Sequence, residues 1–223
     1  MFRACILDLD GTLLDTVESL AYSGNRMLAH FGYPPLPVEN YNYYAGEGAS
    51  MLVRRCLTDA GDKELLHYQE AEPLYRKIFA EDPYYHLKHF PGMKETLDEM
   101  KAEKIRIAVF SNKPHAQAIE VVERMFGKGY FDRIQGQMEG IPRKPSPEGA
   151  LHIAELFGVS PEECMYVGDT WTDMDTGKGA GMFTVGVTWG FRPEEELRSH
   201  QADAVVHQPR ELLKLLEEGG RHD

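Results

Sequence analysis

The chain has 223 residues, with 24 Lys and Arg against 36 Asp and Glu, which gives a formal net charge of −12 at pH 7. This charge repels polyanions, so the sequence predicts no nucleic-acid partner. Hydrophobic residues make up 42% of the chain and charged residues 27%, a balance that supports a buried core and excludes a disordered chain. The length fits one domain that carries a sizeable insertion.

Sequence signals of membrane and secreted proteins are missing. No stretch approaches the ~20 consecutive apolar residues of a membrane span, and the first residues are typical of a strand rather than of a secretory signal. The cysteines Cys5, Cys56 and Cys164 are odd in number and far apart, which argues against a disulfide framework or a zinc site. We expect a cytoplasmic protein with reduced thiols and no membrane partner, either a monomer or a homodimer.

Short apolar runs predict the buried strands of a sheet. They lie at 2–7, 105–110, 131–135, 165–167 and 183–187, and the run at 131–135 is the weakest. Apolar residues at three and four spacing predict helices. These lie at 93–103, 149–157 and 209–218. Because strands and helices alternate, the fold class is predicted to be α/β, with a doubly wound parallel sheet covered on both faces.

The segment 16–85 breaks this alternation. It contains helical patterns at 17–31, 50–60 and 64–80 but no convincing strand. We therefore predict an α/β core formed by 1–15 and 86–223, with an all-helical insertion at 16–85. Turn-forming residues at both ends of the insertion are typical of a hinge, and the last residues, 219–223, are expected to form a frayed tail.

Polar residues follow several of the predicted strands. Asp8, Ser111 and Asp169 stand where the strands near 2–7, 105–110 and 165–167 end. Open α/β sheets bind their ligands at the carboxyl ends of the strands. With Lys144 in the Pro-rich loop before the next helix, these residues are predicted to converge on one crevice, as catalytic groups do.

Acidic residues dominate the predicted crevice. Asp8, Asp10, Asp169 and Asp173 cannot all ionise at close range unless a cation neutralises them. A ligand set made only of oxygen favours Mg²⁺, with Mn²⁺ as a substitute. The metal, Lys144 and the hydroxyl of a nearby serine would then bind a dianion such as phosphate.

Four segments carry a resemblance to a known family. They are DLDGTLLDT (8–16), FSNK (110–113), RKPSP (143–147) and VGDTWTD (167–173). In this order they resemble the four motifs of the haloacid dehalogenase superfamily, and the resemblance covers nearly the whole chain. It implies the Rossmann-like core of that superfamily, and the helical insertion resembles its cap domain.

The resemblance also implies a role for each motif residue. Asp8 would attack phosphorus to form an aspartyl phosphate, and Asp10 would act as general acid and then as general base. The implied Mg²⁺ ligands are the carboxylates of Asp8 and Asp169 and the backbone carbonyl of Asp10. The remaining motif residues are Ser111, Asn112 and Lys144, implied to bind the phosphoryl group, and Asp173, implied to support the metal ligands from outside.

Asp10 separates the subclasses of the superfamily. An alkoxide leaving group needs a proton and a halide does not, so an acid two residues after the nucleophile argues against a dehalogenase. A phosphatase or a phosphomutase remains.

The insertion contains a segment, YAGEGASMLVRRCL (44–57), that is similar to the phosphoglycolate phosphatases of the superfamily. This likeness implies that Gly46, Gly48 and Arg55 bind the substrate, with 2-phosphoglycolate hydrolysed to glycolate and phosphate. Glu47 departs from the expectation, because its charge would repel an anionic substrate. A pyrophosphatase, a sugar phosphatase, a β-phosphoglucomutase-like phosphotransferase and a non-catalytic interaction protein stay open as alternatives.

Overall fold

The computed structural model describes residues 1–219 of the chain. The chain divides into two compact units: an α/β unit formed by Met1–Leu14 and His89–Asp223, and a helical unit formed by Asp15–Lys88. The insertion expected at 16–85 lies inside the helical unit. Of the tail expected at 219–223, only Gly219 falls within the described residues, and it ends the last helix with a φ of 64°.

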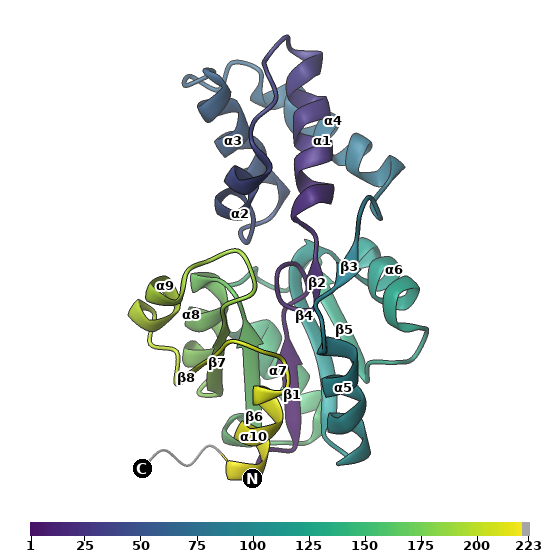
Figure 1. The fold of residues 1–223 in the computed structure, drawn as a ribbon, viewed down its shortest axis with the longest axis vertical. Helices are drawn as coiled ribbons and strands as arrows, with labels where there is room; N and C mark the ends of the chain where they lie inside the picture. Colours follow the sequence, from purple (N-terminus) through teal and green to yellow (C-terminus); the bar gives the residue numbers. More distant parts are fainter. Residues whose placement is uncertain (220–223) are drawn as a thin grey trace. The chain divides into compact units, whose positions relative to one another are not determined.

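One six-stranded sheet forms the centre of the α/β unit (Figure 1). Its strands are β1 (Ala4–Leu7), β4 (Arg106–Pro114), β5 (Arg133–Gln137), β6 (Cys164–Gly168), β7 (Phe183–Val187) and β8 (Ala204–Val206). The order is β5-β4-β1-β6-β7-β8, and every neighbouring pair is parallel. The chain therefore winds outward from β1 in both directions, and the predicted doubly wound α/β fold is confirmed.

Helices connect the strands and cover the sheet (Figure 1). They are α5 (Met93–Ala102), α6 (His115–Phe126), α7 (Glu148–Phe157), α8 (Trp171–Gly179), α9 (Glu194–Ser199) and α10 (Glu211–Glu218), with a 3-10 turn at Pro161–Glu163. On one face, Ile6, Phe110 and Tyr166 pack against Ile153 of α7. Their neighbours along the strands point to the opposite face and are equally buried, so both faces are covered.

Some elements differ from the predicted ones. The strand expected to end at residue 110 continues to Pro114, with an irregular register after Phe110, so Ser111 lies within β4 rather than at its end. β8 and α9 have no counterpart among the predicted elements. β8 has three residues and α9 has six, and neither is long enough to show a hydrophobic period.

The helical unit has its own core. Its elements are α1 (Val17–His30), a 3-10 turn (Val38–Asn40), α2 (Tyr41–Tyr44), α3 (Ala49–Ala60) and α4 (Tyr68–Glu81). Met27, Tyr41, Leu57 and Ala71 are fully buried within it. The short strands β2 (Leu14–Asp15) and β3 (Lys88–His89) form a second sheet where the chain passes between the two units.

The helix expected at 64–80 begins four residues late, at Tyr68. Asp62 accepts hydrogen bonds from the backbone N–H groups of Leu66 and His67 at 2.8 and 2.9 Å, and Leu65 has a φ of 54°. A short acidic side chain that bonds its own following backbone favours a turn over a helix, so the carboxylate of Asp62 delays the start of α4.

Two further expectations can be compared with the structure. The three cysteines are free and buried, as expected for core thiols. Within residues 1–219, no helix combines the length and the apolar character that crossing a bilayer requires.

Candidate active site

The centre of the sheet brings two sequence-distant aspartates together. β1 pairs with β4 on one side and with β6 on the other, and Leu7 lies in register with Val167. Asp8 directly follows β1 and Asp169 follows β6, while the backbone N–H of Asp8 donates to the carbonyl of Val167 at 2.9 Å. Ligands of open α/β sheets bind where the winding direction reverses, and here that point carries these two side chains.

Asp8, Asp169 and Asp173 form a buried acidic cluster. One carboxylate oxygen of each lies within 4.8 Å of the others, and no other group of three such ligands occurs among residues 1–219. Burial, opposed by Lys144, raises the pKa of Asp8 to about 7, and burial together with the other two aspartates raises the pKa of Asp169 well above its usual range. Three buried carboxylates need a positive partner.

A divalent cation fits this cluster. Lys144 Nζ lies 2.8 Å from Asp8 Oδ1 and 2.7 Å from Asp173 Oδ1. One lysine against three buried carboxylates leaves negative charge that a bound cation would balance. The donors are all oxygens, which suits Mg²⁺.

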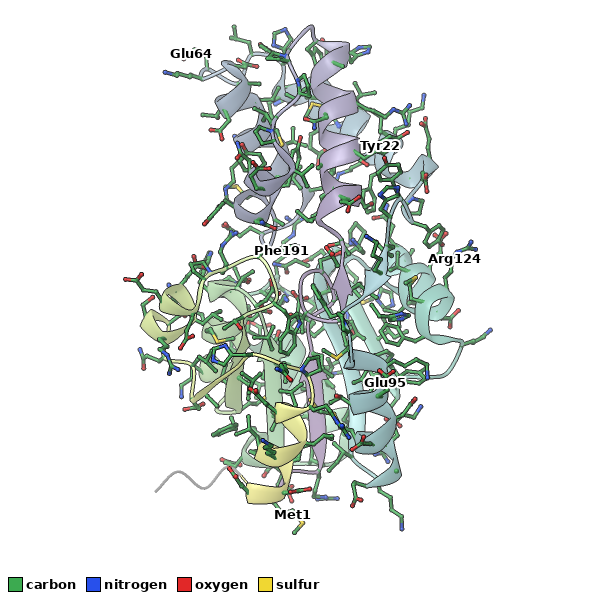
Figure 2. All side chains as sticks on the ribbon, viewed as in Figure 1. Met1, Tyr22, Glu64, Glu95, Arg124 and Phe191 are labelled. Carbon is green, nitrogen blue, oxygen red and sulfur yellow. The ribbon has the colours of Figure 1, made fainter. Side chains whose placement is uncertain are left out.

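Asp169 is held in one orientation from both sides. Its Oδ1 accepts a hydrogen bond from Thr12 Oγ1 and its Oδ2 from the backbone N–H of Phe191, both at 2.8 Å; Phe191 lies in the loop after β7 (Figure 2). A Cβ at Gly11 or at Gly190 would overlap the atoms of Asp169. Both glycines are therefore required for the backbone to approach this carboxylate so closely.

Asp173 serves two neighbours at once. Its Oδ2 accepts hydrogen bonds from the backbone N–H and the hydroxyl of Thr170, at 3.1 and 2.8 Å, which caps the start of α8. Its Oδ1 accepts a hydrogen bond of 2.7 Å from Lys144 Nζ. The side chain of Asp173 thus fixes both the start of α8 and the ammonium group of Lys144.

Lys144 stays charged although it is fully buried. Burial alone would lower its pKa, but the carboxylates of Asp173 and Asp8 raise the pKa of Lys144 well above the usual value. The side chain of Asn112 holds the backbone of Lys144, accepting from its N–H at 2.9 Å and donating to its carbonyl at 3.2 Å. Ser111 is also buried, and its Oγ accepts a hydrogen bond from the backbone N–H of Lys113 at 3.1 Å.

The sequence analysis gave no role to four residues that help to build this site. Thr12, Gly11 and Gly190 orient Asp169, and Lys113 forms a buried ion pair with Asp10, with Nζ 3.0 Å from Oδ1. Gly11 and Thr12 lie in the segment DLDGTLLDT, and Lys113 lies in FSNK. Their closeness in sequence to the motif residues was the signal that could have identified them. No sequence pattern marks Gly190, because its role depends on how closely two loops approach.

The remaining predicted residues belong to the helical unit. Gly46 and Gly48 have φ values of 103° and 86°, and Gly48 precedes α3. Arg55 donates to the carbonyls of Tyr43 and Tyr44 at 3.1 and 3.3 Å and forms an ion pair with Glu47. The charge of Glu47 is therefore balanced locally, and Arg55 has protein partners in this structure.

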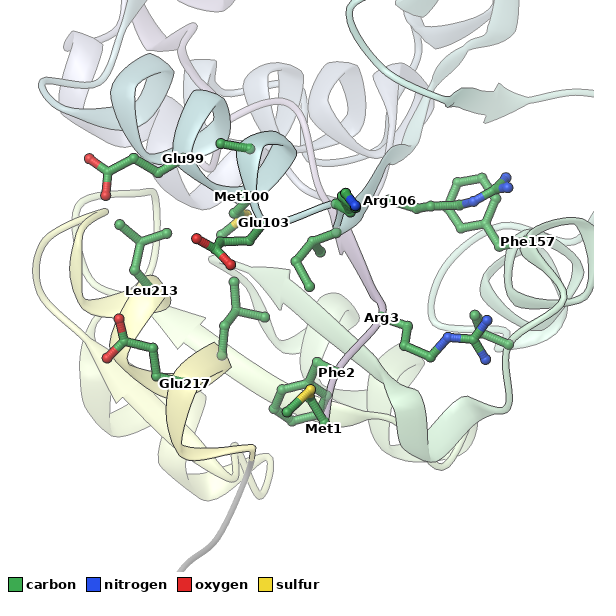
Figure 3. Close-up of a pocket in the computed structure, with 15 residues that line it drawn as sticks. Met1, Phe2, Arg3, Glu99, Met100, Glu103, Arg106, Phe157, Leu213 and Glu217 are labelled. Carbon is green, nitrogen blue, oxygen red and sulfur yellow. The ribbon is translucent and has the colours of Figure 1, made fainter.

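A cavity lies at the opposite end of the strands from the acidic cluster. It has a volume of about 590 Å³ and is lined by Phe2, Arg3, Arg106 and Phe157, next to the beginnings of β1 and β4 (Figure 3). None of the residues of the acidic cluster lines it. The predicted core site residues instead gather at the carboxyl ends of the strands.

Comparison with known proteins agrees with this architecture. The sequence matches the haloacid dehalogenase-like hydrolase family over residues 2–181. It is 32% identical to a phosphoglycolate phosphatase of Nitrosospira multiformis and 31% identical to one of Aquifex aeolicus, over 96% of this chain in both cases and 96% and 97% of the relatives. The crystal structure of a predicted phosphoglycolate phosphatase from Haemophilus somnus has the same fold, with a TM-score of 0.89, 24% identity and coverage of 96% and 98% of the two chains.

The predicted family resemblance is thus confirmed along nearly the whole chain. The motif segments 8–16, 110–113 and 167–173 lie at the carboxyl ends of β1, β4 and β6, and the segment 143–147 lies in the loop between β5 and α7. Three of the four segments supply the buried carboxylates and the lysine of one site. The chain belongs to the haloacid dehalogenase-like hydrolase family.

Proposed function

We propose that this hydrolase is a Mg²⁺-dependent phosphatase of small phosphate monoesters, acting in the cytoplasm as a monomer or a homodimer, with 2-phosphoglycolate as its preferred substrate. One observation carries the proposal: Asp8, Asp169 and Asp173 form a buried acidic cluster beside the charged Lys144. The enzyme class, a phosphoric monoester hydrolase, rests on family membership and on the curated relatives.

Asp8 is the nucleophile in this mechanism. Its carboxylate oxygen attacks phosphorus, a new O–P bond forms, and the bond between phosphorus and the ester oxygen breaks with its electron pair left on that oxygen. The product is an aspartyl phosphate, which divides one difficult displacement into two easier ones. The position of this carboxylate supports the role, because Lys144 Nζ lies 2.8 Å from its Oδ1 and can attract the phosphoryl group to the same place.

Asp10 moves the protons. In the first step its carboxyl group donates a proton to the departing ester oxygen, which leaves as an alcohol. In the second step the resulting carboxylate takes a proton from the attacking water, whose oxygen forms a new bond to phosphorus. The bond between phosphorus and Asp8 breaks with its electron pair left on the Asp8 carboxylate, and inorganic phosphate is released.

The phosphoryl oxygens need positive and hydrogen-bonding partners. Lys144 supplies a charge that its two aspartate partners maintain at every physiological pH, and Ser111 and the backbone N–H of Asn112 supply hydrogen bonds. The side chain of Asn112 is used to hold Lys144, so its contribution to phosphate is assigned to its backbone.

Asp8, Asp169 and the backbone carbonyl of Asp10 would hold the Mg²⁺ ion, with Asp173 behind them. When bound, the ion would neutralise the acidic cluster and polarise a phosphoryl oxygen. Thr12 and the backbone N–H of Phe191 hold the Asp169 carboxylate in one orientation with hydrogen bonds of 2.8 Å, which supports its assignment as a metal ligand.

The substrate assignment rests on the helical unit and on the relatives. Two glycines with positive φ precede α3, whose first N–H groups suit a carboxylate, and Arg55 lies six residues after the first residue of this helix. The curated relatives are named phosphoglycolate phosphatases. We assign the helical unit to substrate selection, as the cap of the enzyme.

Phosphate release from a panel of esters tests the proposal. The panel contains 2-phosphoglycolate, pyrophosphate, a hexose phosphate and p-nitrophenyl phosphate, each with and without Mg²⁺, with Asp8→Asn as the blank. We expect Mg²⁺-dependent release that favours 2-phosphoglycolate and falls by about 10³-fold or more in Asp8→Asn. Thermal unfolding of the variant confirms that it is folded.

The outcomes separate the alternatives. Equal rates over the panel would keep the chemistry and reject the substrate. Preference for pyrophosphate or for the hexose phosphate, or transfer of phosphate to a second sugar, would assign the corresponding alternative activity. Equal rates in wild type and Asp8→Asn would reject the nucleophile.

A further inference from the structure

Lys113 is a second buried lysine of the α/β unit, separate from Lys144. Its side chain is only 7% exposed, and its Nζ lies 3.0 Å from Oδ1 of Asp10, whose side chain is 18% exposed. Lysine is rarely buried to this extent unless it is paired. The ion pair joins residues 103 positions apart in the sequence, so it exists only in the folded sheet.

The two lysines have different partners. Lys144 lies against Asp8 and Asp173, whereas Lys113 is paired with Asp10. In the proposed function Asp8 and Lys144 take part in the phosphoryl transfer, and Asp10 donates and accepts the proton. The pairing therefore directs Lys113 to the proton-transfer step.

The backbone of Lys113 is fixed on both sides. Its N–H donates to Ser111 Oγ at 3.1 Å, and a Cβ added to Gly136 of β5 would lie 2.6 Å from its carbonyl oxygen, so the adjacent strand packs directly against it. β4 is irregular in this stretch, between Phe110 and Pro114. Irregular strand segments redirect side chains near functional sites, and this one brings Lys113 to Asp10.

Asp10 needs such a partner to keep one orientation. It is followed by Gly11, which has a φ of 88°, and the last torsion of an aspartate side chain has a broad, roughly two-fold profile. The hydrogen bond from Lys113 Nζ to Oδ1 restricts this rotation whether or not the second carboxyl oxygen carries a proton, and it leaves that second oxygen for the substrate. Proton transfer needs that oxygen within hydrogen-bond distance of the ester oxygen.

We infer that Lys113 is a positioning residue for Asp10, holding the carboxyl group in the orientation that delivers a proton to the leaving group. The inference rests on the proposed function and deepens it. Lys113 does not touch the phosphoryl group in this role, and it acts through Asp10 alone.

The dependence of the rate on the leaving group tests this inference. An alkyl phosphate needs a proton from Asp10, whereas p-nitrophenolate leaves without one. In Lys113→Met we expect kcat for the alkyl ester to fall about 10- to 100-fold further than kcat for p-nitrophenyl phosphate, since general acids contribute about 10²- to 10⁴-fold. KM for both esters is expected to change little.

Three further variants make the test specific. Lys113→Arg keeps the charge and is expected to recover most of the alkyl-ester rate, which also covers the case in which Lys113→Met folds poorly. In an Asp10→Asn background, Lys113→Met is expected to add no further loss, because the two residues act as one unit. Lys94→Met removes a lysine from an exposed pair with Asp98 and is the matched control, with an unchanged ratio between the two esters.

An equal loss on both esters in Lys113→Met would overturn the inference, as would a full additional loss in the Asp10→Asn background or a rise in KM without a change in kcat. The comparison of wild type with Asp8→Asn tests the proposed function separately. The ratio of two esters within one variant tests Lys113, so failure of one is distinguishable from failure of the other.

Discussion

The site in the α/β unit and the glycine turn of the helical unit are built in opposite ways. Asp169 and Lys144 are fully buried, and each is held by at least two partners. Around Gly46 and Gly48, the charged side chains of Glu47 and Arg55 are 22% and 30% exposed and pair with each other.

Burial decides what each arrangement can do. Charges in a desolvated site act strongly and keep fixed directions, as the chemical step requires. Partly exposed charges act weakly and can exchange partners. Under the proposed function, this comparison assigns the reaction to the buried site and the preference among esters to the partly exposed turn.

Replacing Lys144 of the buried site and Arg55 of the glycine turn by methionine gives the largest expected difference in kinetics between the two regions. Lys144→Met should lower kcat by about 10²- to 10³-fold on every ester, because a buried charge facing the phosphoryl group is lost. Arg55→Met should raise KM only for esters that carry a carboxylate. Steady-state kinetics on 2-phosphoglycolate and p-nitrophenyl phosphate measure both, and a uniform loss of kcat in Arg55→Met would break the comparison.

A second prediction concerns pH and metal. The pKa of Asp8 is raised from 3.8 to about 7, mainly by burial. Between these values the folded state binds more protons than the unfolded state, so this group's contribution to stability falls as pH rises through the window. The metal-free protein should lose several degrees in Tm between pH 5 and pH 8, since 1 kcal/mol corresponds to about 2–4 °C at this size.

Calorimetry of wild type and Asp8→Asn, with and without Mg²⁺, measures this effect. At pH 8 the carboxyl groups of the acidic cluster have lost protons, and Mg²⁺ would neutralise their charge. Mg²⁺ should therefore raise Tm more at pH 8 than at pH 5. Asp8→Asn should flatten the pH profile, and Arg55→Met serves as the control with an unchanged profile. A wild-type Tm that rises steadily from pH 5 to pH 8 would contradict the assignment.

A third contrast compares glycines of the two regions. Gly190→Ala should destabilise the protein by about 1–3 kcal/mol and weaken Mg²⁺ binding, because its Cβ would overlap Asp169 and the carbonyl of Gly11. Gly48→Ala should cost about 1 kcal/mol through its positive φ and leave Mg²⁺ binding unchanged. Urea denaturation and Mg²⁺ titration report these effects, and equal Mg²⁺ affinities in both variants would reject the proposed role of Gly190.

The smallest expected effect is at Glu47. Glu47→Gln removes the charge paired with Arg55 and should lower KM for 2-phosphoglycolate by no more than about 5-fold, because partly exposed pairs are worth about 0.2–1 kcal/mol. KM for p-nitrophenyl phosphate should stay the same. An increase in KM for 2-phosphoglycolate would mean that Glu47 orients Arg55 for the substrate rather than competing with it.

Much of the buried site could be predicted from the sequence. Asp8 and Asp169 each follow an apolar run, and parallel strands bring their ends to one edge. The order of the motif segments then assigned Lys144 and Asp173 to the same place. These inferences need only local patterns and one rule of topology.

Pairings between side chains could not be predicted in the same way. Lys113, near the end of β4, meets Asp10, which follows the neighbouring strand β1, and Arg55 meets Glu47 because Gly48 turns the backbone before α3. Neither approach leaves a period or a motif in the sequence. The late start of α4 depends similarly on hydrogen bonds from a single side chain, that of Asp62.

The place of β1 at the centre of the sheet bears on how the chain matures. β1 pairs with β4 and β6, which are synthesised after it and end at Pro114 and Gly168. At synthesis rates of about 5–20 residues per second, β1 waits for about 8–30 s for its second neighbour. During that interval its apolar residues are exposed and Asp8 has no Asp169 beside it, so a nascent chain is open to chaperones before its acidic cluster is assembled.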